Sequence, residues 1–161
     1  MKERVAVRLG EIRVARGDGI LQAVGLGSCV AAILYDPREK VGGLAHIMLP
    51  VELRTRRPAP IGRYATTAIP QLIEEMLSLG AGRRGMYARL VGGAAMFDSI
   101  LAEDGPALGT RNIQAVRAAL ADASIPIRGE AVGGNFGRTV HFHISDGRVI
   151  VSAVRHPDVN L

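Results

Sequence analysis

Cysteine and tryptophan are the residues this chain has least of. Its 161 residues include one cysteine, Cys29, and no tryptophan, and only 4% of them are aromatic. One cysteine cannot form an internal disulfide, so the composition does not point to an oxidising compartment. The core must be built from aliphatic side chains and methionine, and the hydrophobic content of 48% is ordinary for a globular chain. We therefore expect one domain over residues 1–161.

Long apolar runs are also missing. No segment approaches the roughly 18 consecutive apolar residues that identify a membrane span. Residues 1–19 are charged throughout and lack the apolar core of a signal peptide. We therefore predict a cytoplasmic protein that does not insert into a membrane.

Lysine is scarce, so the net charge of +5 comes almost entirely from arginine. Arginines gather at only two places, which are Arg54, Arg56 and Arg57, and the pair Arg83 and Arg84. No aromatic residues are interleaved with them, as a surface that binds single-stranded nucleic acid would require. We predict no nucleic-acid partner, and we interpret the Arg54 to Arg57 cluster as attracting an acidic protein partner.

Apolar alternation and glycine-rich breaks predict several short strands. We expect a first strand over residues 4–16, and apolar extended chain over residues 20–35 that is broken by Gly25 and Gly27. A turn at residues 36–39 then leads to a returning strand at 40–49. Later strands are predicted at 86–91, 126–132, 138–144 and 148–154.

Two segments have the 3.6-residue period of amphipathic helices. In the first, residues 63–80, Gly80 is a plausible stop, and Pro70 either kinks the helix or marks its first turn. Its apolar stripe is Ile69, Leu72, Ile73, Met76 and Leu77. The second covers residues 110–124, with Thr110 as the expected N-cap. Together these elements predict an α+β fold, a layered sandwich of mixed or antiparallel sheets with helices packed outside.

The single cysteine follows two glycines, and a histidine lies on the next predicted strand. If Tyr35 pairs with Lys40 across the turn, Cys29 stands directly opposite His46, with Cβ atoms about 4.5–5.5 Å apart. A thiolate paired with an imidazolium has a lowered pKa and is a nucleophile near neutral pH. The same two residues also fit a small buried thiol and a hydrogen-bonded structural histidine. The residues alone leave both interpretations open.

The wider pattern resembles the CheD family, the bacterial chemoreceptor glutamine deamidases. The resemblance begins with GLGSCVAAILYDPREKVGGLAHIMLP at residues 25–50. It continues through residues 63–81, 91–97, 109–112 (GTRN) and 132–149 (VGGNFGRTVHFHISDGRV), in the family's order. The resemblance therefore covers nearly the whole chain.

This resemblance implies a fold similar to that of toxins that deamidate glutamine. It implies hydrolysis of glutamine side chains to glutamate on the cytoplasmic helices of chemoreceptors, and CheC phosphatase as a further partner. Cys29 and His46 match the catalytic Cys and His of the family, which would act through a thioester. Backbone N–H groups around Gly27 and Ser28 would bind the oxyanion. We expect no cofactor and no metal, because His141 and His143 alone are too few ligands for zinc.

One position departs from the family pattern. Family members place a threonine, the third catalytic residue, six residues before the cysteine, where this chain has Ala23. Either Ser28, Thr139 or Asn135 supplies the orienting group, or the protein is slow. The alternative function is a weakly active or inactive adaptor that binds CheC or receptors without turnover.

Overall fold

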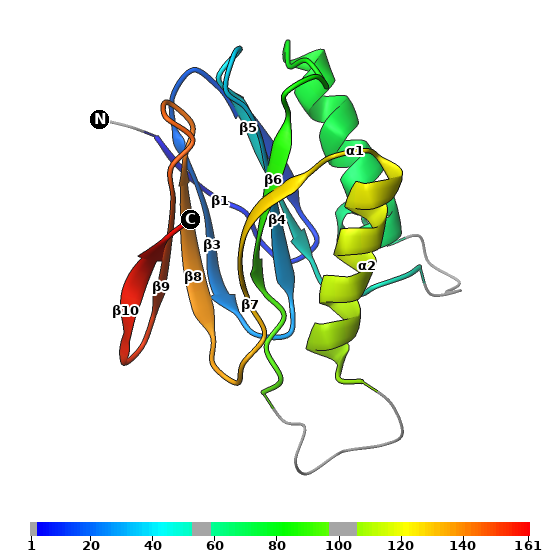
Figure 1. Ribbon diagram of the computed structural model, residues 1–161, viewed down its shortest axis with the longest axis vertical. Helices are drawn as coiled ribbons and strands as arrows, with labels where there is room; N and C mark the ends of the chain where they lie inside the picture. Colours follow the sequence, from blue (N-terminus) through cyan, green and yellow to red (C-terminus); the bar gives the residue numbers. More distant parts are fainter. Residues whose placement is uncertain (1–2, 53–58, 97–105) are drawn as a thin grey trace.

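Two β-sheets stack face to face, and two helices cover the outer surface of one of them (Figure 1). This computed structural model describes residues 3–52, 59–96 and 106–161. The predicted α+β sandwich with helices outside is confirmed. The predicted Arg54 to Arg57 cluster lies outside the described residues. No helix in these three ranges is long and apolar enough to cross a membrane.

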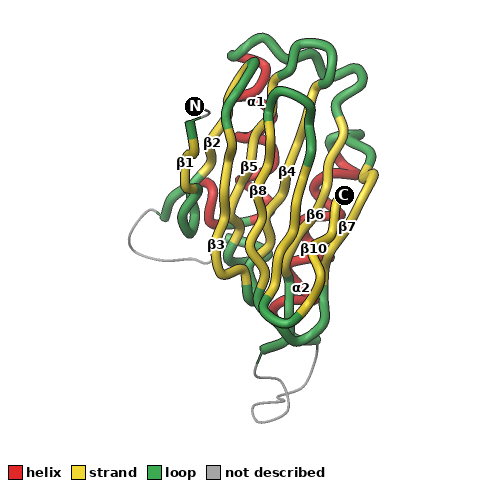
Figure 2. Tube along the Cα trace, turned by 90° about the vertical axis from the view of Figure 1, so that its left-hand side faces the viewer, coloured by secondary structure: helices red, strands yellow, loops and turns green. Residues whose placement is uncertain are grey.

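Each sheet has five strands and combines parallel with antiparallel pairs. The first sheet has the order β1 (Arg4–Ala6), β3 (Ile20–Leu26), β8 (Arg138–His143), β9 (Val149–Ala153) and β10 (His156–Asn160). The second sheet has the order β2 (Ile12–Arg16), β5 (Val41–Ile47), β4 (Val30–Asp36), β6 (Tyr87–Gly92) and β7 (Ile127–Val132). Figure 2 shows the first sheet in front with the helices behind. The chain therefore crosses from the first sheet to the second between β1 and β2, and again between β3 and β4.

The helices are α1 (Ala65–Ser78), which follows the short 3₁₀ helix η1 (Ile61–Arg63), and α2 (Leu108–Asp122). The predicted stripe of α1 faces the core, since Ile69, Leu72 and Met76 are fully buried. Pro70 lies inside α1, and Gly80 ends the helix region with a φ of +105°. The expected N-cap at Thr110 is wrong, because α2 begins two residues earlier and Ala107 precedes it without a side-chain cap.

The second sheet separates two hydrophobic clusters. Alternate residues of β4, such as Ala32 and Leu34, face the helices, whereas Ala31 and Ile33 face the first sheet. This alternation is the two-residue period of a strand that is buried on both sides. The cluster between the sheets also contains Leu44 of β5 and half-buried Cys29. Cys29 therefore belongs to the layer between the sheets.

The predicted first strand, residues 4–16, is interrupted and its two halves lie in different sheets. The chain leaves β1 after Ala6, turns at Gly10 with a φ of +76°, and joins the second sheet as β2. The turn is stabilised by the Arg8 N–H, which donates to a carboxylate oxygen of Glu11 at 2.9 Å. One strand over residues 4–16 was therefore wrong, and the interruption brings residues 7–11 next to the end of β5.

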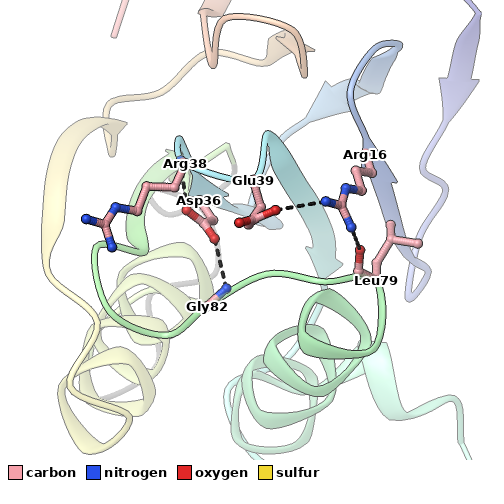
Figure 3. Close-up of polar contacts among 6 residues, drawn as sticks. All are labelled: Arg16, Asp36, Arg38, Glu39, Leu79 and Gly82. Atoms are coloured by element: carbon pink, nitrogen blue, oxygen red, sulfur yellow. Dashed lines mark hydrogen bonds and ion pairs between the residues drawn. The ribbon is translucent and has the colours of Figure 1, made fainter.

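The turn between β4 and β5 sets the register of the predicted cysteine–histidine pair. Asp36 is the last residue of β4, and its carboxylate accepts hydrogen bonds from the N–H groups of Arg38 (2.9 Å) and Gly82 (2.8 Å) (Figure 3). Lys40, which we expected to begin the returning strand, has a φ of +51° and belongs to the turn. Asp36 pairs with Val41, so every pair is shifted by two from the prediction.

The same end of the sandwich is held by Arg16 of β2. Its guanidinium donates to the carboxylate of Glu39 at 2.8 Å and to the carbonyl of Leu79 at 3.1 Å (Figure 3). These contacts join the β4–β5 turn to the end of α1. The contacts at this end of the sandwich stabilise the β4–β5 turn, and the predicted site lies at the opposite end.

Candidate active site

His46 lies near the end of β5, where its main chain is bonded to the crossing segment between the sheets. Its N–H donates to the Glu11 carbonyl at 3.0 Å, and its carbonyl accepts from the Gly10 N–H at 2.9 Å. His46 is opposite Ala31 in the register, and only 3% of it is exposed. Since Ala31 faces the first sheet, His46 faces it as well.

The imidazole of His46 is oriented by a main-chain carbonyl. Nδ1 lies 2.9 Å from the carbonyl oxygen of Val7, and a carbonyl only accepts, so Nδ1 carries the proton. In the neutral ring Nε2 then has a free lone pair, and this buried atom has no hydrogen-bond partner among the described residues. Burial lowers the pKa of His46, although the bond to Val7 and the charge of Glu11 oppose the shift. The ring is therefore a neutral base at pH 7 with Nε2 available.

Cys29 lies in the connection between β3 and β4. Figure 1 shows this connection at the lower end of the sandwich. It is a half-buried free thiol, and burial raises its pKa. The prediction that it stands directly opposite His46 is wrong, because that place belongs to Ala31. A shift of two residues preserves the face of a strand, however, so both side chains remain on the layer between the sheets.

The two pKa shifts bear on the expected ion pair. A raised thiol pKa and a lowered imidazole pKa both favour the uncharged Cys29 and His46. No hydrogen bond joins the thiol to Nε2 in this structure. Both shifts therefore favour an uncharged thiol and an uncharged ring at pH 7, not the thiolate and imidazolium that the sequence suggested. In such a pair the base takes the proton as the thiol attacks.

The loop formed by residues 27–29 has all three of its main-chain carbonyls hydrogen-bonded. The Gly27 carbonyl accepts from the Ala94 N–H at 2.8 Å, and the Cys29 carbonyl accepts from the Gly93 N–H at 2.8 Å. The Ser28 carbonyl accepts from the side-chain amide of Asn112 at 2.9 Å. In a trans peptide the C=O and the next N–H point in opposite directions. The N–H groups of Ser28 and Cys29 therefore point away from these anchors, and neither donates to another described residue.

Glycines allow the anchoring segment to approach this loop closely. Gly92 has a φ of +110°, and a Cβ atom there would collide with the carbonyl oxygen of Cys29. A Cβ at Gly109, in the first turn of α2, would lie 2.5 Å from the carbonyl oxygens of Gly93 and Ala94. Residues 92–94 and the first turn of α2 thus meet beside the Cys29 carbonyl in a close-packed crossing.

A cavity of about 410 Å³ opens beside His46. Its lining includes Val7, Leu9, Gln22 and Val24, and its size lies within the range of about 300–1,000 Å³ that is usual for small-ligand sites. Leu9 and Val24 are more than half exposed, which gives the entrance an apolar rim. The cavity therefore leads from the surface to the imidazole.

The other predicted side chains make no hydrogen bond to the imidazole among the described residues. Thr139 is on the outward face of β8, where its Oγ1 accepts a 3.5 Å bond from the Gly25 N–H. It lines a groove of about 500 Å³ that shares Val24 and Gly25 with the cavity beside His46 but does not include His46. Asn135 is exposed in the loop before β8. Ala23 is fully buried in the cluster between the sheets. None of the three bonds to His46 in the described structure, where the partner of Nδ1 is Val7.

Two groups of this site, the Val7 carbonyl and the Asn112 side chain, were not among the residues predicted from the sequence. A main-chain carbonyl leaves no residue-type signal, so nothing in the sequence could have identified Val7. Asn112 lies in the GTRN block, which was used to identify the resemblance, and its side chain is completely buried. Among the described residues no group of three or more His, Cys, Asp or Glu is placed to hold a metal ion.

Comparison with known proteins gives a consistent result. Residues 48–153 match the family described as CheD chemotactic sensory transduction. A protein of Caldanaerobacter subterraneus subsp. tengcongensis named "Probable chemoreceptor glutamine deamidase CheD" is 43% identical over 93% of both chains. One of the same name from Archaeoglobus fulgidus is 42% identical over 96% of both chains. The Thermotoga maritima protein named "Chemoreceptor glutamine deamidase CheD" is 40% identical over 92% of this chain and 90% of its own.

Among solved structures the match is weak. The hypothetical protein YfiH of Bacillus licheniformis covers 70% of this chain and 47% of its own length, with 14% identity and a TM-score of 0.39. A likeness at this level does not assign the fold.

Proposed function

The chain belongs to the CheD family, and from this premise we propose that it deamidates specific glutamine side chains of chemoreceptors. The observation that carries the proposal is the state of His46. Its Nδ1 proton is bound by the Val7 carbonyl and its Nε2 has no partner among the described residues, and the side chain faces the same layer between the sheets as Cys29. We further propose that the sandwich is of the kind found in deamidating toxins, and that the protein works in the cytoplasm. Its substrate would be the receptor's cytoplasmic helices.

The reaction begins with attack of the Cys29 sulfur on the glutamine carboxamide carbon. Nε2 of His46 takes the thiol proton as the carbon–sulfur bond forms, and the carbonyl oxygen becomes an oxyanion. The N–H groups of Ser28 and Cys29, directed away from their anchored carbonyls, are the proposed donors to that oxyanion. Collapse of the intermediate breaks the carbon–nitrogen bond, and the imidazolium proton leaves with ammonia.

Hydrolysis of the thioester completes the reaction. Nε2 takes a proton from water as the water oxygen attacks the thioester carbon, and the carbon–sulfur bond then breaks. The leaving sulfur recovers its proton from His46, and the glutamine has become glutamate. One water is consumed and one ammonia is released. These steps use only the side chains and main-chain groups described above.

The missing family hydroxyl at Ala23 favours a second candidate, an adaptor of this fold that binds CheC or receptors without useful turnover. Cys29 is, in addition, a neutral thiol without a hydrogen bond to His46. Catalytic hydrogen bonds are often long in free enzymes and tighten when substrate binds, so this resting geometry suits either candidate. Slow alkylation of Cys29 would suit both as well, because burial raises its pKa.

Mass spectrometry of a chemoreceptor cytoplasmic fragment separates the two candidates. The fragment is incubated with the wild-type protein or with Cys29→Ala, and each glutamine is followed for conversion of amide to acid. We expect conversion with the wild type only. Receptor binding without any conversion by the folded wild type would refute the deamidase and support the adaptor. Conversion by Cys29→Ala would remove Cys29 as the nucleophile.

A further inference from the structure

Asn112 is a buried amide that joins the two halves of the candidate active site. Its Nδ2 donates to the Ser28 carbonyl at 2.9 Å and to the Met48 carbonyl at 3.0 Å. Ser28 directly precedes Cys29, and Met48 lies two residues beyond His46. Because two carbonyls only accept, the nitrogen of the amide must be the atom that faces them. One side chain of α2 thus holds the cysteine loop and the end of the histidine strand together.

The rest of the bonding suggests that this amide does more than fill space. Asn112 is fully buried, and its Oδ1 has no hydrogen-bond partner among the described residues. An unsatisfied buried acceptor is costly, and an apolar side chain at this position would avoid that cost. It would also leave the Ser28 carbonyl without the only donor that the described structure gives it. The arrangement therefore favours local geometry over stability.

We propose that Asn112 is a positioning residue for the deamidation reaction, which holds the Ser28–Cys29 peptide so that the Cys29 N–H faces the developing oxyanion and the thiol faces the carboxamide carbon. This rests on the proposed function. The bond to the Ser28 carbonyl sets the direction of the Cys29 N–H on the other side of the same peptide. The bond to the Met48 carbonyl sets the distance between that peptide and the His46 strand. Asn112 itself contacts no reacting atom.

The test compares Asn112→Ala with Val116→Ala. Val116 lies one turn farther along α2, is also fully buried, and packs in the cluster between helices and sheet. It is therefore a control for lost packing of α2. We expect Asn112→Ala to lower kcat by about 10²-fold, the cost of misplacing reacting groups by about 1 Å, with KM unchanged. Val116→Ala should keep the wild-type kcat at a temperature where both variants are folded.

A second readout does not depend on deamidation. Iodoacetamide reacts with Cys29, the only thiol of the chain, and the pH midpoint of its alkylation reports the environment of the sulfur. We expect Asn112→Ala to shift this midpoint to lower pH, because a released loop exposes the thiol, while Val116→Ala leaves it unchanged. If Asn112→Ala is unfolded, Asn112→Ser, which retains one hydroxyl donor, replaces it and should shift both readouts in the same directions.

The outcomes separate the two hypotheses. A wild type that converts no glutamine refutes the proposed function, and the alkylation midpoint still decides whether Asn112 positions Cys29. A kcat and a midpoint that match those of Val116→Ala would overturn the role of Asn112, whatever the wild type does. A fall in stability alone, equal in the two variants, would show a structural residue only.

Discussion

Replacing His46 separates the orientation of the ring from its chemistry. In His46→Asn the Nδ2 atom lies the same number of bonds from Cα as Nδ1 of histidine, so it can still donate to the Val7 carbonyl. His46→Ala removes that donor and leaves the buried carbonyl unpaired, which costs about 1–3 kcal/mol. We therefore expect His46→Ala to be less stable than His46→Asn by about 1–3 kcal/mol at pH 7.5. Urea unfolding followed by circular dichroism measures this difference.

Both variants lack a base, so both should lose deamidation. General acid–base catalysis contributes about 10²–10⁴-fold, and we expect a loss of that order in each. Equal stabilities would show that the bond to Val7 does not anchor the ring. Activity of His46→Asn within about tenfold of the wild type would refute His46 as the base, since a loss of at least about 10²-fold is expected.

The same variant tests the protonation state of His46. Burial lowers the folded-state pKa of this ring below its ordinary value of about 6.5. Below that pH the unfolded chain binds a proton that the folded protein does not bind, so stability is lost as the pH falls from about 6.5 through the folded-state pKa. His46→Asn cannot titrate, and groups common to both proteins cancel in the comparison. The stability of the wild type relative to His46→Asn should therefore fall between pH 7.5 and 5.5, and a constant difference would contradict a neutral buried His46.

Two further substitutions test the surroundings of the pair. Gly92→Ala should lower both stability and kcat, because its Cβ would displace the Cys29 carbonyl. Gly85, which has a similar φ of +92° but open space around it, is the control, and Gly85→Ala should lower stability alone. Equal kcat values in the two variants would argue against the close approach of Gly92 to the Cys29 carbonyl. Ala23→Thr should change kcat far less than the roughly 10⁴-fold that an orienting group can be worth, because the Val7 carbonyl already binds the Nδ1 proton of His46. Steady-state kinetics measure this change. A rise in kcat of about 10⁴-fold would show that the Val7 carbonyl does not replace the hydroxyl.

The layers of this fold could be predicted because its hydrophobic periods are strong. The apolar stripe of α1 has the period of a helix, and the apolar run of β4, which spans 7 residues, has the length of a buried strand. The strand over residues 4–16 could not be divided from the sequence, since both halves alternate in the same way and only the turn at Gly10 separates them. The expected register failed for a similar reason. The four-residue turn begins one residue later than predicted, because the Asp36 side chain caps it and Lys40 adopts a positive φ.

That error had a limited effect on the predicted site. Moving a turn of constant length by one residue changes the pairing by two, and a shift of two leaves every side chain on its original face. Cys29 and His46 consequently remained in the layer between the sheets, although not as direct neighbours. The sequence thus predicts which face of the sheet a strand residue occupies more reliably than it predicts the residue opposite it on the next strand.

The group that orients His46 is a main-chain carbonyl, which side-chain patterns in the sequence cannot indicate. The missing hydroxyl at Ala23 directed attention to Ser28, Thr139 and Asn135, which are all side-chain donors or acceptors. A neutral imidazole has only one N–H, and here the Val7 carbonyl takes it. A hydroxyl near Nδ1 would compete for a proton that is already bound. The absence of a threonine at position 23 is therefore compatible with catalysis by Cys29 and His46, provided that the segment between β1 and β2 keeps the Val7 carbonyl in contact with the ring.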